Sequence, residues 1–174
     1  MERAKEMFLQ YGGNRYYMSL DGAEQIYNSY RVSKETEEEW RREFLDGFFE
    51  QKRFGKDALG AYRTAADLLK NDGECRERFL YYPIRSDRLD DVTALFMLRI
   101  TFRTAEKWAG KGVLSKEEAA AYLAALDRYA KDVQKRAEEG TMTRSEDYTM
   151  QEFSDPVYIA DYLKDLRQRW AGLL

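Results

Sequence analysis

The sequence predicts an all-α fold: an irregular single-domain bundle of six to eight helices around a central helix at about residues 87–110. Apolar residues recur at helical spacing along most of the chain, and no stretch alternates apolar and polar residues as a β-strand does. Only 2 of the 174 residues are proline, so few positions force the chain out of a helix. A chain of this length forms one domain by default. It needs neither a metal nor a disulfide to fold, because it can bury roughly 70% of its extended surface.

Five helices are expected before the central one, and capping or breaking residues mark their ends. Gly12 ends the first helix, because glycine is typical after a last helical residue. Ser19 and Ser33 cap the second and third helices. Pro83 ends the fifth at or before Tyr82, since the residue before a proline disfavours helical dihedrals. In chain order, these helices span residues 2–11, 20–30, 34–54 (ended by Gly55), 56–71 and 74–82.

The central helix is the most apolar run that is long enough to form a full helix. Its apolar side chains cover most of the helical circumference, which is typical of a helix inside a domain. We expect Ser86 or Asp87 to cap this helix and Gly110 to end it. The apolar residues are Leu95, Phe96, Met97, Leu98, Ile100, Phe102 and Trp108.

Two long helices are expected after the central one. Ser115 and Glu118 have the spacing of a capping box, which predicts a helix over 116–138. The nearly heptad apolar seam of this helix suits antiparallel packing against the central helix. Pro156 occupies the favoured first position of the last helix. Residues 141–154 are long for a plain connection, so they form either a functional loop or a helical turn of their own.

The composition argues against several classes of function. The net charge of -3 disfavours a protein that coats nucleic acid, because such binding needs a basic face. The single cysteine, Cys75, excludes an intrachain disulfide and a thiolate zinc site, and a reducing compartment is the natural reading. The first residues lack the apolar core of a signal peptide. No apolar run approaches the roughly 20 residues of a membrane span. These features predict a cytoplasmic protein that does not bind membranes.

The sequence also lacks the usual groups for catalysis. There is no histidine, the most versatile acid–base residue and the usual partner of a catalytic cysteine. The closely spaced acids lie where helix ends or solvent-facing positions already explain them, so we expect no metal site. No glycine-rich nucleotide loop is present either. No catalytic residue, metal or cofactor is therefore assigned.

The most distinctive charged feature is an arginine seam on the central helix. Arg88, Arg99, Arg103 and Glu106 fall on one narrow stripe, roughly 60° wide at 100° per residue. Three arrangements are open for this seam. It can face solvent, or it can pair with acids of neighbouring helices, because a buried charge needs a partner. In the third arrangement, Arg99 and Arg103 line a pocket for an anionic ligand, with tyrosines as its walls.

A second cluster combines arginine and tyrosine over residues 76–88, including Tyr82 and Arg85. Such a mixture suits single-stranded nucleic acid or a phosphorylated ligand, and it is equally enriched at protein interfaces. Nearby acids almost neutralise the segment, which favours ordinary packing of the tyrosines under a short helix. The nearly neutral charge of this segment thus argues against nucleic acid as a partner.

Together these observations predict a non-catalytic cytoplasmic protein that acts through protein–protein interaction, with another protein or a second copy of itself as partner. The alternative is a binder of, or an enzyme acting on, a small anionic ligand with a phosphate or carboxylate group. The speculative ligand-binding residues for that alternative are Arg99, Arg103, Arg85 and Tyr82. An exposed apolar patch or a symmetric dimer would favour the first reading.

Overall fold

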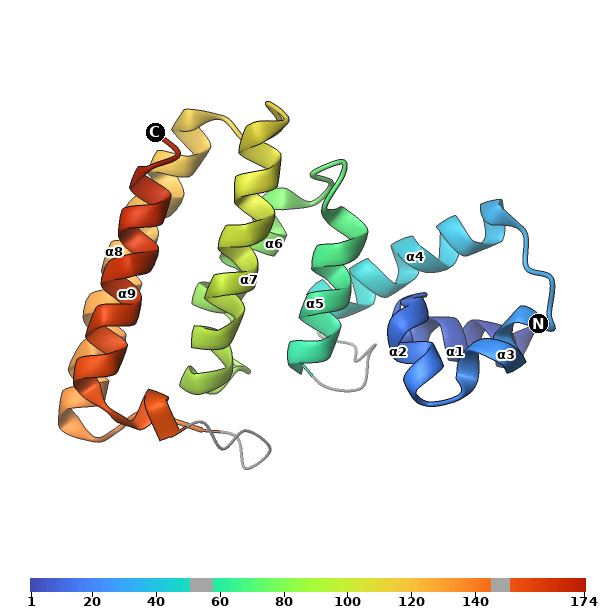
Figure 1. Ribbon diagram of the computed structural model, residues 1–174, viewed down its shortest axis with the longest axis horizontal. Helices are drawn as coiled ribbons and strands as arrows, with labels where there is room; N and C mark the ends of the chain where they lie inside the picture. Colours follow the sequence, from blue (N-terminus) through green and yellow to red (C-terminus); the bar gives the residue numbers. More distant parts are fainter. Residues whose placement is uncertain (51–57, 145–150) are drawn as a thin grey trace. The chain divides into compact units, whose positions relative to one another are not determined.

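The structure, a computed structural model, describes residues 1–50, 58–144 and 151–174. Over these residues the chain forms nine α-helices and one short 3-10 helix, without a β-strand (Figure 1). The all-α prediction is confirmed, with one helix more than the predicted maximum. The helices gather into two compact units, Met1–Leu68 and Leu69–Leu174. The single domain expected from the chain length stays a prediction.

Short helices pack beside a longer one in the first unit. In order, they are α1 (Glu2–Tyr11), α2 (Arg15–Leu20), α3 (Ala23–Asn28), α4 (Lys34–Phe49) and α5 (Ala58–Leu69). Phe8 of α1 lies between two aromatic rings, with centroid distances of 6.1 Å to Tyr27 and 5.7 Å to Trp40. All three side chains are buried, so α1, α3 and α4 share one aromatic core.

The prediction of one helix over residues 20–30, capped by Ser19, is wrong. Only α3 lies within this stretch, whereas α2 ends at Leu20 and begins earlier, at a cap formed by Asn14. The Asn14 side chain accepts hydrogen bonds from the backbone N–H groups of the second and third residues of α2. Ser19 lies inside α2 and donates to the carbonyl of Tyr16. Gly22 has a φ of 71°, and this left-handed turn separates α2 from α3.

The third predicted helix, α4, is capped by Ser33 as expected but ends earlier than predicted. It ends at Phe49 rather than near Phe54, and the N–H of Glu50 bonds to the carbonyl of Asp46 at 2.9 Å. The basic residues Lys52 and Arg53, on which the longer helix was predicted, lie outside the described residues. The predicted break at Gly55 lies outside the described residues.

Four α-helices and the 3-10 helix form the second unit. They are α6 (Arg76–Arg85), α7 (Asp91–Gly110), α8 (Lys116–Glu139), η1 (Gln151–Ser154) and α9 (Pro156–Ala171). In Figure 1, α7, α8 and α9 lie side by side, and α8 runs opposite to the other two. The ring of Trp108 lies 5.6 Å from Phe79, and the ring of Trp170 lies 5.8 Å from Phe102. The core therefore joins α7 to both α6 and α9.

The predicted central helix is α7, but it begins at Asp91 instead of Asp87. Its cap is Asp90, whose carboxylate accepts hydrogen bonds from the Thr93 N–H at 3.0 Å and the Thr93 hydroxyl at 2.6 Å. Ser86, one of the two predicted caps, instead ends α6 with extended dihedrals. Residues 87–89 form a turn and a bend between the two helices, so the later aspartate becomes the cap.

Pro83 does not end α6, which contradicts the prediction. The helix passes through Pro83 and ends at Arg85. Because proline has no N–H, one hydrogen bond to the carbonyl of Phe79 is lost. That loss falls in the last turn, and the proline ring is buried in the core, so packing offsets a limited cost.

The predicted ends of α8 and α9 are confirmed, whereas the packing of α8 is only partly as expected. The Ser115 hydroxyl accepts from the Glu118 N–H at 3.1 Å, and the Glu118 carboxylate accepts from the Ser115 N–H at 2.9 Å. Pro156 opens α9. Although α8 runs antiparallel to α7, its backbone contacts are mainly with α9. The ring of Tyr122 contacts that of Trp170 of α9, with the ring centroids 4.2 Å apart and the planes tilted by 34°.

The connection between α8 and α9 contains η1, so the predicted helical turn is present. Within the described residues, no helix combines the length and the apolar character needed to cross a membrane.

Candidate functional site

A groove of about 270 Å³ runs along the outer seam between α8 and α9. We call it the α8–α9 groove. Its lining residues are Ala130, Lys131, Gln134, Lys135 and Glu138 from α8, and Ala160, Leu163 and Arg167 from α9.

Small side chains create this groove. The lining residues of each helix recur at helical spacing, which places them on one face. Ala130 and Ala160 are too small to fill the seam where the two helices face one another, so the apolar floor stays recessed. Leu163 completes that floor and is buried.

Cations surround the apolar floor. Lys131 and Lys135 are exposed on α8, one helical turn apart. Across the seam, Arg167 donates from Nε to the carbonyl of Leu163 at 3.2 Å, and its Nη1 lies 3.6 Å from the Asp127 carboxylate. No described carboxylate pairs with Lys131. The groove thus offers cationic donors that the protein itself does not fully neutralise.

One acid, Glu138, closes the other end of the groove. Gln134 holds it there, because the Gln134 amide Nε2 donates to the Glu138 carboxylate at 3.2 Å and to the carbonyl of Pro156 at 3.3 Å. This pair of bonds fixes the amide orientation, since a flipped amide would set oxygen against oxygen. Gln134 therefore ties the end of α8 to the start of α9.

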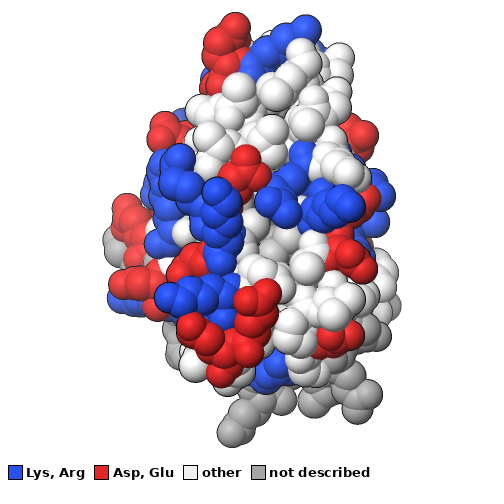
Figure 2. Space-filling view, turned by 90° about the vertical axis from the view of Figure 1, so that its left-hand side faces the viewer, with Lys and Arg blue, Asp and Glu red and all other residues white. Residues whose placement is uncertain are grey.

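Figure 2 shows this face of the second unit. Basic side chains form a band across its middle, and a cluster of acidic side chains lies below that band. The lower end of α8 in Figure 1 is its carboxyl end, where Glu138 and Glu139 follow each other in the sequence.

The sequence-predicted residues Arg99 and Arg103 lie elsewhere. Both side chains are exposed on α7, and neither lines the α8–α9 groove. The guanidinium of Arg99 lies 5.3 Å from the centre of the Tyr162 ring. Burial raises the pKa of Tyr162, and the nearby Arg99 charge opposes that rise. The exposure of Arg99 and Arg103 corresponds to the solvent-facing arrangement of the three considered. Arg88, the first residue of the predicted seam, precedes α7 and is not part of that helix.

Arg85 and Tyr82 both lie on α6, and neither lines the α8–α9 groove. The Arg85 guanidinium lies 3.8 Å from the centre of the Tyr81 ring and 3.6 Å from the Glu77 carboxylate. Tyr82 is half-buried, and burial raises its pKa. Arg85 is thus already engaged with its own helix, and these two residues are on a different helix from Arg99 and Arg103.

A second charged cluster ties the chain after α8 to the start of α7. The Asp91 carboxylate accepts from Arg136 Nη2 at 2.7 Å and from the Thr143 N–H at 3.0 Å. Burial by itself would raise the pKa of Asp91, but hydrogen bonds from Arg136 and Thr143 outweigh it and hold that pKa below its usual value. We call this the Asp91 cluster. Its partners are already paired within the protein, which identifies it as a structural feature.

Two further observations bear on the choice of site. Over the described part of the chain, no three His, Cys, Asp or Glu residues are grouped as a metal site requires. On α2, Tyr16 and Leu20 are 66% and 63% exposed and one turn apart. This exposed pair is apolar but carries no charge that would define a partner.

Sequence reasoning missed the α8–α9 groove. Lys131 and Lys135, which follow Ala130 in the sequence, could have indicated this groove, because they place two cations one turn apart close to a small residue. The sequence does not show which residues of α9 face them, so the opposing pair of Ala160 and Arg167 could not be found from periodicity alone.

Comparison with known proteins gives no matching family model, no matching curated protein and no matching solved structure. The geometry of the α8–α9 groove is therefore what supports a function for this protein.

Proposed function

We propose that this chain is a non-catalytic binding protein that holds a short, acid-bearing segment of another protein in the α8–α9 groove. The observation that carries the proposal is the combination of three cations, Lys131, Lys135 and Arg167, around a recessed apolar floor. An apolar pocket with charged groups at its rim is the usual anatomy of a protein-recognition surface.

The charge of the rim selects the partner. A carboxylate can approach Lys131 without displacing an internal partner, and Arg167 has further N–H donors beyond those it gives to Leu163 and Asp127. Because Lys131 is exposed and Arg167 is partly exposed, each ion pair with the partner contributes little affinity. Their main effect is on specificity and on the rate of association.

The size of the groove selects a short segment. Its volume, about 270 Å³, lies just below the roughly 300–1,000 Å³ of pockets that enclose small molecules. A few side chains of an extended peptide fill such a space, and the rest of the segment remains at the surface. Small interfaces of this kind are typical of weak, transient complexes.

The small-anion alternative has less support. It requires Arg99 and Arg103 to converge on a cavity, and both are exposed on α7. The exposed pair Tyr16 and Leu20 is compatible with a protein partner but does not indicate its chemistry. A cytoplasmic location remains an expectation from the sequence.

A peptide-display experiment tests the proposal. Random heptapeptides are selected on the full chain, and the Lys131→Glu, Arg167→Glu double variant is used for counter-selection. We expect the enriched peptides to carry Asp or Glu next to an apolar residue. A labelled synthetic copy should bind the wild-type chain in fluorescence polarisation and lose about tenfold in affinity for the double variant, as expected when two rim charges are reversed.

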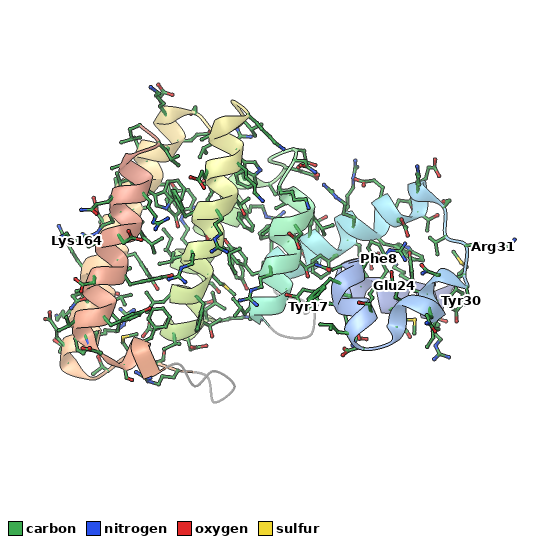
Figure 3. The ribbon with its side chains drawn as sticks, viewed as in Figure 1. Phe8, Tyr17, Glu24, Tyr30, Arg31 and Lys164 are labelled. Atoms are coloured by element: carbon green, nitrogen blue, oxygen red, sulfur yellow. The ribbon has the colours of Figure 1, made fainter. Side chains whose placement is uncertain are left out.

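Lys164→Glu is the matched control. Lys164 projects from the side of α9 opposite to α7 (Figure 3), and it is exposed but does not line the groove. The control should change affinity less than about twofold, as for other exposed charges. An equal loss in the control, or enriched peptides without acids, contradicts the proposal. Displacement of the peptide by micromolar citrate supports the small-anion alternative instead, and a concentration-dependent dimer abolished by the double variant identifies a second copy as the occupant.

A further inference from the structure

We infer that Glu138 determines specificity in the α8–α9 groove, so that the bound segment carries an acid and a base three positions apart. This inference rests on the proposed function. It concerns the order of charges within the partner segment, which the proposed function leaves open.

The two ends of the groove have opposite charge. Lys131 and Arg167 mark the positive end, where Arg167 reaches back to Asp127. Gln134 contacts Pro156 at the other end, so the beginning of α9 lies against the last turns of α8. Glu138 lines the groove and is bonded to that same Gln134 side chain, so it lies at the second end. A bound segment therefore lies against cations at one end of the groove and against an acid at the other end.

The negative end keeps its charge because Glu138 is held away from the neighbouring lysine. Its carboxylate accepts a hydrogen bond from the neutral amide of Gln134. Lys135 lies 4.0 Å from Glu139 instead. No cation among the described residues pairs with Glu138. An acid of the partner at this end would be repelled, whereas a lysine or arginine would be attracted.

The length of the groove sets the spacing. Lys131 and Glu138 are seven residues apart on α8, which corresponds to about 10 Å along the helix axis. An extended peptide advances roughly 3.3 Å per residue, so about three residues cover that length. The complementary segment thus has its acid and its base at positions i and i+3, in either chain direction, with apolar residues between them over Leu163.

Short labelled peptides test this inference on the full chain. One has Asp and Lys separated by Leu-Val, the second has the reversed order, and the third has Asp at both positions. If only net charge mattered, the peptide with two acids would bind best to a basic groove. We expect the better of the two mixed peptides to bind about threefold tighter than the two-acid peptide, the size expected for one exposed charge pair. Glu138→Lys should reverse this order.

Asp161→Lys is the control, because it makes the same charge change at an exposed position of α9 outside the groove. It should leave the order of affinities as in the wild type. If the two-acid peptide binds best to the wild type, or if Glu138→Lys does not change the order, the inference is wrong while the proposed function stands. If none of the three peptides binds, and the display selection also yields no acid-bearing peptide, the proposed function itself fails.

Discussion

The helices α2 and α3 of the first unit contain six residues each, whereas α7 and α8 of the second unit contain 20 and 24. A six-residue helix has too few hydrogen bonds to compensate the cost of forming its first turn. Its position therefore depends on turn residues and on the packing around it. A long helix has several turns of apolar periodicity, so many residues together specify that the segment is helical.

This difference explains the failed prediction over residues 20–30 of the first unit. The single helix expected there is replaced by α3 and the last residue of α2, because Asn14 and Gly22 determine the turns in that region. In the second unit, α8 has the capping box that the sequence predicts, and it spans Lys116–Glu139 where a helix over 116–138 was expected. The two units thus differ in how strongly single turn residues control the structure, and this difference can be tested by substitution.

The largest expected effect comes from a glycine in the first unit. Gly12 has a φ of 58°, and a Cβ added there would lie 2.4 Å from the Thr64 side chain and 2.9 Å from the Phe44 ring. Gly12→Ala should lower the free energy of unfolding by about 3 kcal/mol, which combines left-handed backbone strain with overpacking. Urea denaturation followed by circular dichroism measures this change.

Gly140→Ala in the second unit is the comparison for Gly12→Ala. Gly140 has a φ of 69°, but a Cβ added there meets nothing within 4 Å. Only the strain remains, at about 1 kcal/mol. Equal losses for the two variants would show that close packing around Gly12 contributes nothing, and that the two units depend on turn glycines alike.

The second prediction concerns the Asp91 cluster and its dependence on pH. Asp91→Asn should cost about 2 kcal/mol at pH 7, because Arg136 loses its best-buried charged partner. The pKa of Asp91 is lowered in the folded state. Its contribution is therefore fully present above the unfolded pKa of about 3.9 and is lost as the pH falls through the lower folded pKa. Urea midpoints of the variant and the wild type should converge toward pH 3.

Asp132→Asn serves as the control for Asp91→Asn. Asp132 pairs with the same Arg136, but its side chain is 64% exposed, against 13% for Asp91. The control should cost less than about 0.5 kcal/mol, as exposed ion pairs do. A difference between Asp91→Asn and the wild type that does not depend on pH would contradict the assignment of the stabilisation to the charged carboxylate.

The smallest effect compares two serine caps, one in each unit. Ser115→Ala should cost about 1 kcal/mol, because it removes half of the capping box with Glu118. Ser33 accepts from the Thr36 N–H at 3.2 Å without a reciprocal carboxylate, so Ser33→Ala should cost about half as much. Thermal unfolding of the two variants gives the ratio. A larger loss for Ser33→Ala would mean that the cap matters more in the unit with shorter helices.

Much of the fold was accessible from the sequence for a physical reason. Capping depends on residues three apart, and burial depends on helical spacing, so Ser115 and the apolar face of α7 could be recognised locally. Pro83 shows the limit of such rules, because its effect depends on where in the helix it falls and on whether its ring is buried. The candidate site was less accessible, since Arg99 and Arg103 looked distinctive in the sequence but face solvent.

The sequence by itself determined the all-α class, the long helices and most of their caps, because those properties depend on neighbours within a few residues. The tertiary structure decided that α8 packs mainly against α9 and that Ala130 faces a groove shared with Arg167. It also decided that Asp90, and neither Ser86 nor Asp87, is the N-cap of α7. These outcomes depend on residues far apart in the chain, and helical periodicity shows which face of a helix is apolar but not which helix will cover it.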